Sequence, residues 1–464
     1  MAYKDQARAR NNQSALKSRF SEYAAAVQSP AMVSRVANAR GFLLLLLRRL
    51  RRHLPWIIII VAITVLEILY HIRSPLETLA EPLDKPFATG CRNPPIDAPR
   101  ANATLLMLAR NSDVNGAVAA IRSVEDRFNH WAHYPIIFLN DEPFNSTFTT
   151  ALSSVSSGEV TFATIPRGMW SMPSQLNNER AQKAMVFQKD HKVPYGGMES
   201  YHHMCRFNSG FFYDMAELQK YRWYWRIEPN VRFTCDITYD PFIEMQRAGK
   251  KYGYIIALWE LIGTAPTLYR KLSDYKTLHS FPTTRLWSAL IKRSIAPWPI
   301  RKMLALTQRN RNSAGDKWNT CHFWSNFEIA DMDWYRGPEY RNLFSFLDQD
   351  GGFYLERWGD APIHTLAAAM LLKDSEIHHF RDWGYSHPPF QYIPATPKLR
   401  KKGDWKLGEL QNVRVPEEVR ERNEMRGCNC EVSFELSSVI HPYCANVVGR
   451  ALYGTADVDI DAQG

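Results

Sequence analysis

The feature that most constrains this chain is a run of apolar residues that directly follows four arginines. Residues 54–72 contain a single acidic side chain, Glu67, and the arginines lie between positions 48 and 52. A helix of about 17–20 apolar residues crosses the hydrocarbon core of a bilayer, and a basic flank stays on the cytosolic side. We therefore expect a transmembrane signal anchor over 54–72, a basic cytosolic tail over 1–53 and a lumenal C-terminal part. A helix buried in a soluble core is the alternative.

The positive charge of the chain gathers before this segment. The net charge is +10, and residues 1–53 contain 11 Lys and Arg against 2 Asp and Glu, so they carry +9 and the rest of the chain carries +1. A protein that reads nucleic acid shows its basic patch on the folded domain. The charge therefore indicates a membrane flank, and we expect no nucleic-acid partner.

Two further features fit a lumenal C-terminal part. Asn102-Ala-Thr104 and Asn145-Ser-Thr147 are acceptor triplets for N-glycosylation. All seven cysteines follow the anchor, and an oxidising compartment permits disulfides, with at least one thiol left over. A metal site at Cys428-Asn-Cys430 is the weaker alternative, because the pair lacks the usual spacing and no second pair is near.

The composition changes twice after the anchor. Residues 73–100 hold six prolines; proline lacks an N–H and breaks regular structure, so this segment predicts a stem. A folded domain is expected over 101–464. Its stretch from about Pro394 to Arg426 is highly charged with few apolar runs, and we expect it to wrap the surface of the domain.

Short apolar runs alternate with a helical pattern at the start of this domain. We expect strands at Thr104–Ala109, Tyr134–Leu139 and Val160–Ile165, and a helix at Val114–Phe128. This alternation predicts a parallel α/β sheet, whose ligands gather at the carboxyl ends of the strands. Further strands are expected at Tyr221–Ile227 and Tyr252–Leu258, and a further helix at Ala361–Leu372.

Two blocks place carboxylates among aromatic and amide side chains. The run Cys321-His-Phe-Trp-Ser-Asn-Phe-Glu-Ile-Ala330 contains Glu328, and Gly351-Gly-Phe-Tyr-Leu-Glu-Arg-Trp-Gly-Asp360 ends at Asp360. A carboxylate in aromatic surroundings is desolvated, which raises its pKa and prepares it for proton transfer or nucleophilic attack. Aromatic rings beside carboxylates also suit the apolar face and hydroxyl rim of a sugar. A buried, hydrogen-bonded core acid is the alternative reading of Glu328.

A cation site is a further possibility at the end of an aromatic strand. Glu228 follows Tyr221–Ile227, and an acid in such a place can hold a divalent cation against a diphosphate leaving group. Mg²⁺ and Mn²⁺ favour carboxylate oxygens, and Mn²⁺ accepts imidazole. The candidates for a second ligand are His364, His378, His379 and His387. Two prolines after His387 fix the loop that carries it, although a single histidine is more often a surface or core residue.

Five segments of the chain, taken together, match a known sequence pattern. They are Tyr201-His-His-Met-Cys-Arg-Phe207, Trp225-Arg-Ile-Glu-Pro229, Cys321-His-Phe-Trp-Ser-Asn-Phe-Glu-Ile329, Glu356-Arg-Trp-Gly-Asp-Ala-Pro-Ile-His364 and Gly384-Tyr-Ser-His-Pro-Pro389. They resemble the fungal Golgi α-1,2-mannosyltransferase family, the glycolipid 2-alpha-mannosyltransferases. The resemblance runs from about Ala101 to Pro394. The segment from about Tyr269 to Lys317 does not follow the family pattern. This segment is basic and could alter the choice of acceptor.

The resemblance implies a GT-A-type α/β domain with a Rossmann-like mixed sheet, a GDP-mannose donor and Mn²⁺. Glu228 and His387 fall at the metal-binding positions of the family. Glu328 falls at its candidate nucleophile and Asp360 at another acid that lines the site. The positions expected to bind the donor and its nucleotide are Tyr201, Arg110 and Arg206.

The function that the resemblance implies is transfer of mannose, with retention, to the 2-hydroxyl of a mannose acceptor. The acceptor would be an N-linked or O-linked glycan of secretory and cell-wall mannoproteins, and the enzyme a single-pass type II protein of the Golgi membrane. One alternative is transfer of mannosyl phosphate or another hexose by the same fold. Another is a catalytically inactive, membrane-tethered glycan-binding protein, against which the three carboxylates at 228, 328 and 360 argue.

Overall fold

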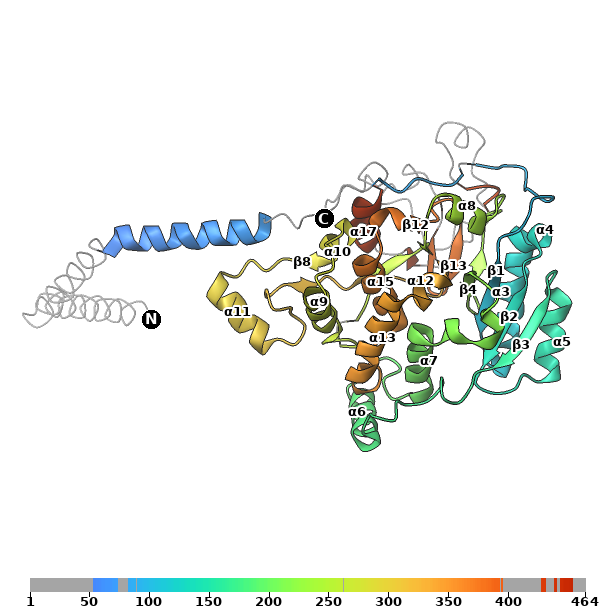
Figure 1. Ribbon diagram of the computed structural model, residues 1–464, viewed down its shortest axis with the longest axis horizontal. Helices are drawn as coiled ribbons and strands as arrows, with labels where there is room; N and C mark the ends of the chain where they lie inside the picture. Colours follow the sequence, from blue (N-terminus) through green and yellow to red (C-terminus); the bar gives the residue numbers. More distant parts are fainter. Residues whose placement is uncertain are drawn as a thin grey trace, which may run out of the picture. The chain divides into compact units, whose positions relative to one another are not determined.

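The computed structural model describes residues 53–73, 82–88, 90–261, 263–392, 394, 427–430, 438–439 and 443–453. They fall into two units, one with the helix His53–Arg73 and one with an α/β body (Figure 1). The helix is long and apolar enough to cross a membrane, and no residue of its most apolar stretch is buried, which fits the predicted anchor. The predicted tail over 1–52 and most of the predicted wrap, 395–426, lie outside the described residues.

A seven-stranded mixed sheet forms the centre of the body, in the order β12-β6-β11-β4-β1-β2-β3. Strand β11 is antiparallel to both of its neighbours, and all other neighbouring pairs are parallel. The strands are β1 Ala103–Leu108, β2 Ile136–Asn140, β3 Val160–Thr164, β4 Trp223–Ile227, β6 Tyr252–Tyr254, β11 Glu328–Asp331 and β12 Ile377–His379. The predicted parallel arrangement of the first three strands is confirmed.

One predicted strand is wrong in its extent. Residues Tyr252–Leu258 were expected to form a single strand, but the chain bends at Ile255 and Ile256, which are both buried. Strand β6 stays in the central sheet, whereas β7, Ala257–Trp259, pairs with β10, Cys321–Phe323, in a separate two-stranded sheet. The residues before, within and after the bend are all buried, so the apolar run in the sequence is not interrupted there. The sequence pattern therefore does not show where the strand ends.

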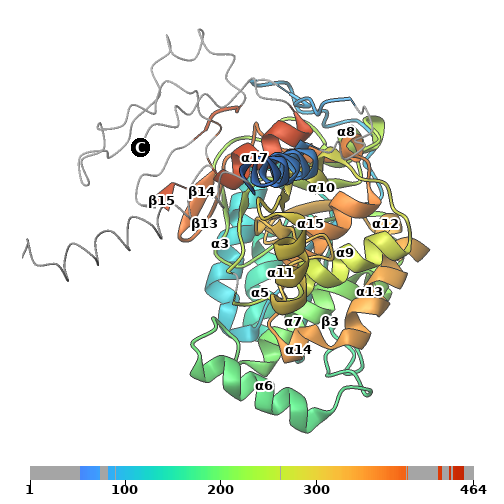
Figure 2. The ribbon, with the colours of Figure 1, turned by 90° about the vertical axis from the view of Figure 1, so that its left-hand side faces the viewer.

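Helices cover both faces of the sheet (Figures 1 and 2). One face packs against α3 Val114–Val124, α4 His130–Ala132, α5 Ser146–Val155 and α8 Pro241–Arg247. The core on the other face is shared by α6 Asn178–Asp190, α7 Glu199–Gly210, α9 Leu268–Leu278, α10 Arg285–Ala289, α12 Met332–Arg336, α13 Pro338–Asp350, α14 Gly352–Leu355, α15 Asp360–Leu371 and α17 Tyr443–Leu452. The predicted helix at Ala361–Leu372 corresponds to α15.

Strand β4 shows how the sequence divides between the two faces. Its side chains alternate, so Trp223 and Trp225 enter the core under α3 and α8, while Tyr224 enters the core under α7 and α15. Arg226 follows Tyr224 on the same face, and Glu228 continues this period just beyond the strand. The alternation therefore places an aromatic, a cationic and an anionic side chain in one row at the carboxyl end of β4.

A smaller sheet extends the body beside the end of β4. Its order is β15-β14-β13-β5, with β5 at Arg232–Phe233, β13 at Tyr385–His387, β14 at Phe390–Tyr392 and β15 at Ser438–Val439. Strand β5 lies only a few residues after Glu228, and β13 pairs with β5 in an antiparallel manner. This pairing brings the end of β13, with His387, back toward the end of β4.

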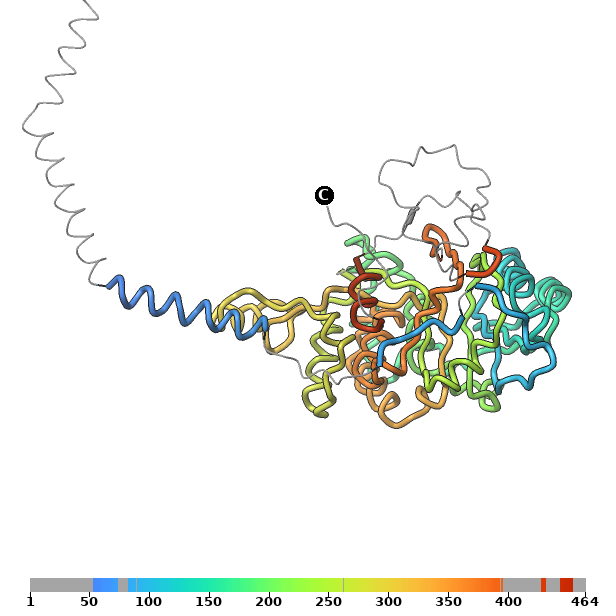
Figure 3. The backbone as a smooth tube through the Cα atoms, turned by 90° about the horizontal axis from the view of Figure 1, so that it is seen from above, coloured from blue at the N-terminus to red at the C-terminus, as the bar shows by residue number. Residues whose placement is uncertain are grey.

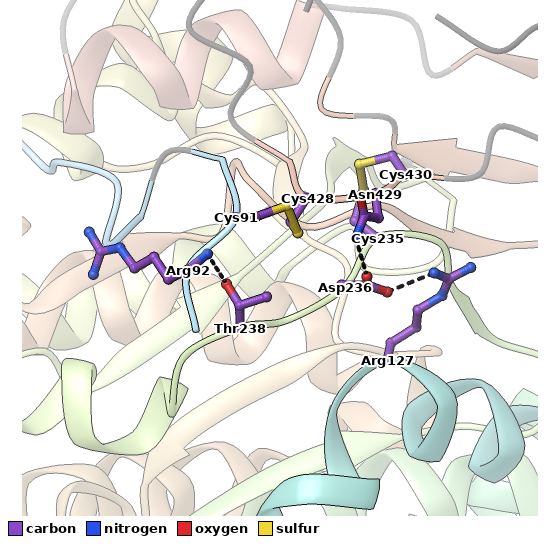
Figure 4. The surroundings of a disulfide bond; sticks show 9 residues. All are labelled: Cys91, Arg92, Arg127, Cys235, Asp236, Thr238, Cys428, Asn429 and Cys430. Carbon is purple, nitrogen blue, oxygen red and sulfur yellow. Dashed lines mark hydrogen bonds and ion pairs between the residues drawn. A yellow bond between two sulfur atoms is a disulfide. The ribbon is translucent and has the colours of Figure 1, made fainter. Parts of the chain in front are cut away.

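Three disulfides join distant parts of the chain: Cys91–Cys428, Cys235–Cys430 and Cys321–Cys444. Figure 4 shows the first two side by side, with Asp236 accepting from Arg127 and Asn429 beneath them. The seventh cysteine, Cys205, is a buried free thiol whose pKa is raised by burial. The prediction of disulfides with one thiol left over is confirmed, and the metal alternative for Cys428 and Cys430 is wrong because both are oxidised.

The second half of the expected stem is part of the folded body. The segment before β1 runs across the body (Figure 3). The fully buried carboxylate of Asp84 accepts from Lys250 Nζ at 2.7 Å and lies 2.9 Å from His378 Nδ1, and Phe87 stacks on the His378 ring at 3.7 Å. Prolines exclude regular structure here but do not prevent side chains from packing, so composition alone overestimates the length of the spacer.

Replacing Asp84 with Asn is expected to lower the free energy of unfolding by about 3–5 kcal/mol at pH 7, because it leaves the Lys250 ammonium buried without its counter-charge. Burial disfavours the carboxylate, but His378 and Lys250 outweigh burial and hold the pKa of Asp84 below its usual range. The contribution is therefore present above the unfolded pKa, near 4, and is lost as the pH falls through the folded pKa. Denaturant unfolding at several pH values measures it. Asp97→Asn, at an exposed acid in the same segment, is the matched control and should change little.

Candidate active site

A network of charged side chains forms where β4 ends. The buried guanidinium of Arg226 donates from Nη1 to Asp360 Oδ2 and from Nη2 to Glu228 Oε1, both at 2.5 Å. Burial disfavours the Arg226 charge, but the carboxylates of Asp360 and Glu228 more than compensate and raise the pKa of Arg226. Arg226 thus stays charged and fixes the two acids relative to each other.

Asp360 enters this network from a helix. It is the first residue of α15, where a carboxylate is favoured by the helix dipole, and its Oδ2 also accepts from Ser325 Oγ at 2.8 Å. Burial opposes ionisation of Asp360, but Arg226 and His364 outweigh burial and lower its pKa. Asp360 is therefore an anion at neutral pH.

The two carboxylate oxygens of Glu228 face different groups, Oε1 toward Arg226 and Oε2 toward His387. Oε2 lies 4.0 Å from His387 Nε2, and both side chains are about a quarter exposed. The other three candidate histidines have different neighbours: His364 contacts Glu328, His378 contacts Asp84, and His379 Nε2 contacts the carbonyl of Ile255. Of the four, the structure brings only His387 to Glu228.

The pair of Glu228 and His387 suits a divalent cation that is shared with a substrate. In the part of the chain that the structure describes, no cluster of three or more His, Cys, Asp or Glu side chains could hold a metal ion. A carboxylate oxygen and an imidazole nitrogen are acceptable ligands for Mn²⁺, and cations of this kind often take their other ligands from phosphates and water. The donor set therefore fits, provided that a diphosphate completes it.

Glu328, from the first of the two acid blocks, lies in a separate, fully buried cluster. Glu328 is completely inaccessible to solvent. Its Oε1 accepts hydrogen bonds from the hydroxyls of Tyr224 and Tyr335, and its Oε2 accepts from Tyr252 at 2.7 Å and lies 2.8 Å from His364 Nδ1. Oε1 thus has two hydroxyl donors, and Oε2 has one hydroxyl donor and the His364 imidazole beside it. We call this set of four side chains around Glu328 the carboxylate cage.

The cage borders the charged network. Glu328 is directly opposite Arg226 in the register of β11 and β4, and Tyr224, Arg226 and His364 line one small cavity beneath α7. The predicted burial of Glu328 among aromatic side chains is confirmed. Because both of its oxygens already accept hydrogen bonds from tyrosine hydroxyls, the geometry corresponds to the hydrogen-bonded core acid that the sequence left open.

Tyr201 lies on α7 and is connected to a second ion pair. Its hydroxyl accepts from Arg357 Nη1 at 3.1 Å, and Arg357 Nη2 donates to Glu260 Oε1 at 3.0 Å. The exposed ring of Tyr195 stacks on Tyr201 at 4.6 Å. Burial raises the pKa of Tyr201 well above its usual value, so the hydroxyl stays protonated and can donate to a ligand.

The two predicted arginine sites have different outcomes. Arg110 follows β1, is exposed, and donates to Ser200 Oγ at 3.1 Å, which links it to the start of α7. Arg206 is buried, and its guanidinium donates to both oxygens of Asp348 and to the carbonyl of Ser171. The structure thus does not bring Arg206 to the charged network, since its donors hold α7 to α13.

Sequence reasoning missed the residues that organise the others. Arg226, Tyr224 and Tyr252 were treated only as parts of strands and motifs, and Tyr335 was not singled out at all. For Arg226 a signal existed: it stands two residues before Glu228 in a strand, so the two share a face. The tyrosines come from β4, β6 and α12, and no local pattern in the chain shows that they converge.

The family model of the glycolipid 2-alpha-mannosyltransferases matches residues 76–418. The O-glycoside alpha-1,2-mannosyltransferase homolog 4 of Schizosaccharomyces pombe is 39% identical over 79% of this chain and 81% of its own length. The alpha-1,2 mannosyltransferase KTR1 of Saccharomyces cerevisiae is 40% identical over 66% of this chain and 74% of its own length.

Solved structures show the same fold. The core-mannan synthase A of Aspergillus fumigatus, in a form with Mn and GDP, superposes with a TM-score of 0.59 at 32% identity and covers 72% of this chain and 88% of that one. The mannosyltransferase Ktr4p of S. cerevisiae in complex with GDP gives 0.60 at 31% identity, with 79% and 90% covered. The predicted GT-A-type mixed sheet is confirmed, and the chain belongs to the glycolipid 2-alpha-mannosyltransferase family of enzymes.

Proposed function

We propose that this protein is a retaining α-1,2-mannosyltransferase that uses GDP-mannose and Mn²⁺. Its acceptor would be the 2-hydroxyl of a mannose on N-linked or O-linked glycans of secretory and cell-wall mannoproteins. The single observation that carries the proposal is the meeting of Glu228 and His387 beside the Arg226–Asp360 pair at the end of β4. Family membership supports the transfer of mannose.

Glu228 and His387 would hold Mn²⁺, which supplies Lewis-acid neutralisation of the departing diphosphate. Arg226 fixes one oxygen of Glu228 and leaves the other facing His387, so the ligand side chain is oriented before any substrate arrives. Arg110, at the carboxyl end of β1, would contact the nucleotide. Tyr201 would donate its hydroxyl to the donor, oriented by Arg357.

Asp360 would contact a sugar hydroxyl at the reacting end of the donor. Its Oδ2 is already shared by Arg226 and Ser325, so Oδ1 is the atom that would accept from a substrate. Trp324 lies next to His387, with ring centroids 5.1 Å apart, and would offer an aromatic surface to a pyranose.

For Glu328 we favour electrostatic support over nucleophilic attack. A nucleophile needs a carboxylate oxygen that can reach the anomeric carbon, and the carboxylate cage occupies both oxygens. In the alternative same-face reaction, the C1–phosphate bond breaks while the acceptor oxygen bonds to C1 from the same side. The departing phosphate takes the acceptor proton. The buried negative charge of Glu328 would then stabilise positive charge that develops on the donor sugar.

The proposed location is the Golgi membrane, with the helix His53–Arg73 as a single-pass anchor and the body in the lumen. The helix has the length and composition of a membrane span. The three disulfides fit an oxidising compartment.

Incubation of the purified full-length protein with GDP-mannose, Mn²⁺ and methyl α-mannoside tests the activity. We expect a disaccharide with an α-1,2 linkage and release of GDP, identified by NMR of the product. A product that keeps phosphate, or turnover only with another sugar nucleotide, would instead show the alternative transfer reactions. Absence of turnover with every donor, despite binding of mannose, would show a glycan-binding protein.

A further inference from the structure

Helix α11, Trp298–Thr307, exposes its apolar side chains to solvent and buries an arginine. Within its residues 299–307, the side chains that face the body are Arg301, which is 5% exposed, and Ala305, which is 4% exposed. The face toward solvent carries Ile300, Met303 and Leu306, which are 48%, 56% and 83% exposed. A surface helix of a soluble domain normally buries its apolar stripe, so this exposed face indicates a contact that the body alone does not provide.

The helix holds this orientation through polar contacts on its inner side. Arg270 Nη1 donates to the carbonyl of Ala305 at 2.6 Å. Lys302 Nζ, at the flank, donates to the carbonyl of Ser313 at 3.0 Å. Gly315 lies so close to Arg301 that a Cβ at that glycine would stand 2.2 Å from Arg301 Cγ. These contacts determine which face points outward. We call Ile300, Met303 and Leu306 the α11 apolar face.

The sequence around α11 is rich in positive charge. Residues 285–317 contain eight Lys and Arg and a single acid, Asp316. Lys317 pairs with Lys292 in the register of β8, Ile291–Lys292, and β9, Lys317–Trp318, and with Arg311 in an isolated bridge, so these three cationic residues are neighbours. An exposed apolar helix face within a segment rich in Lys and Arg has the composition of a helix that lies in the interface of a membrane with anionic lipids.

The chain itself keeps a lipid surface within reach. Only ten residues separate Arg73, the end of the proposed anchor, from Asp84, which is buried in the body. A fully extended chain of that length spans at most about 40 Å. A tether this short gives the body a high effective concentration at the bilayer, so even a weak interfacial helix would be occupied.

We propose that the α11 apolar face inserts into the lipid surface of the membrane that anchors the chain, with exposed cations of this segment, such as Lys302, on anionic headgroups. This contact would fix the orientation of the body on the bilayer. It rests on the proposed anchor but not on the proposed reaction. Helix α11, which lies within the basic segment Tyr269–Lys317, would then serve membrane contact.

The test uses the full-length protein with Met303→Cys labelled by an environment-sensitive nitrobenzoxadiazole probe. Six of the seven cysteines are in disulfides and Cys205 is buried, so the label is specific. The protein is reconstituted into vesicles of phosphatidylcholine and phosphatidylserine. We expect a blue shift of the emission relative to detergent, quenching by lipids with brominated acyl chains, and a smaller effect when phosphatidylserine is omitted.

Val186→Cys on α6 is the matched control, since Val186 is also an exposed apolar helix residue, 57% accessible. It shares the tether but should show neither the shift nor the quenching. Equal signals at both positions would overturn the proposal. A blue shift at position 303 without lipid quenching would also overturn it, because it would reveal a protein partner.

Ile300→Ser with Leu306→Ser, in the Met303→Cys background, should abolish quenching. Undiminished quenching would show that the tether and not the face brings the probe to lipid. Transfer to methyl α-mannoside should be unchanged in all these variants.

Discussion

Replacing Glu328 with Gln is expected to lower the rate of mannosyl transfer by roughly 10²–10³-fold, the loss typical when a preorganised electrostatic group is removed from an active site. The amide is neutral, and its NH₂ group cannot accept from the tyrosine hydroxyls that it would face in the carboxylate cage. Binding of GDP should be intact, because Glu228, His387 and Arg110 are untouched. Steady-state kinetics and calorimetry with GDP measure the two quantities, and near-normal transfer would refute a role for Glu328.

The matched control is Asp382→Asn, another buried carboxylate. Asp382 accepts from Tyr239 at 2.8 Å in the core on the other face of the sheet, and burial raises the pKa of Asp382 to about 7. A neutral side chain is therefore already favoured there. Because the folded pKa lies above the unfolded one, ionisation of Asp382 costs stability as the pH rises toward 7. Asp382→Asn should keep its activity and be at least as stable as the wild type above that pH.

Azide distinguishes support from nucleophilic attack by Glu328. If Glu328 were the nucleophile, Glu328→Ala with azide would give β-mannosyl azide, since azide would attack from the vacated side as GDP leaves. We expect no such product, and no mannosyl group on Glu328 in mass spectra of the wild type during turnover. A peptide with mannose on Glu328 would overturn the assignment of the carboxylate cage as support.

Replacing His387 with Ala is expected to lower transfer by roughly 10²–10³-fold, because stabilisation of a leaving diphosphate by a metal ion amounts to several kcal/mol. Glu228→Gln should behave alike and, in addition, leave one arm of Arg226 with a weaker partner. In each variant, the affinity for GDP should be the same with and without Mn²⁺. In the wild type, Mn²⁺ should increase the affinity for GDP. Calorimetry shows this, and the electron paramagnetic resonance of Mn²⁺ reports the bound ion without reference to activity.

His191→Ala is the control for this pair of variants. His191 is an exposed histidine at the end of α6, with its Nδ1 2.8 Å from the carbonyl of Phe187, and its loss should alter neither transfer nor the effect of Mn²⁺. If His387→Ala retained Mn²⁺-dependent GDP binding, the second ligand would have to be sought elsewhere.

Much of the fold was visible in the sequence because it depends on local periodicity. The strand–helix–strand pattern from Thr104 to Ile165 predicted three parallel strands, and the helix at Ala361–Leu372 was found to within a residue at each end. The antiparallel direction of β11 could not be predicted, because strand direction depends on how the chain returns to the sheet. The packing of Asp84 was missed for a similar reason, since its partners Lys250 and His378 are far away in sequence.

The sequence by itself determined the types of group available for chemistry: an acid after an aromatic strand, a histidine fixed by two prolines, and two acids in aromatic blocks. Only the tertiary structure decided how they are used. It selected His387 from four histidines by pairing β13 with β5, and it placed Arg226 between Glu228 and Asp360. It also enclosed Glu328 with side chains from β4, β6, α12 and α15. Hydrogen bonds and charge pairs act over a few ångströms in space, so residues distant in the chain set the chemistry of each group.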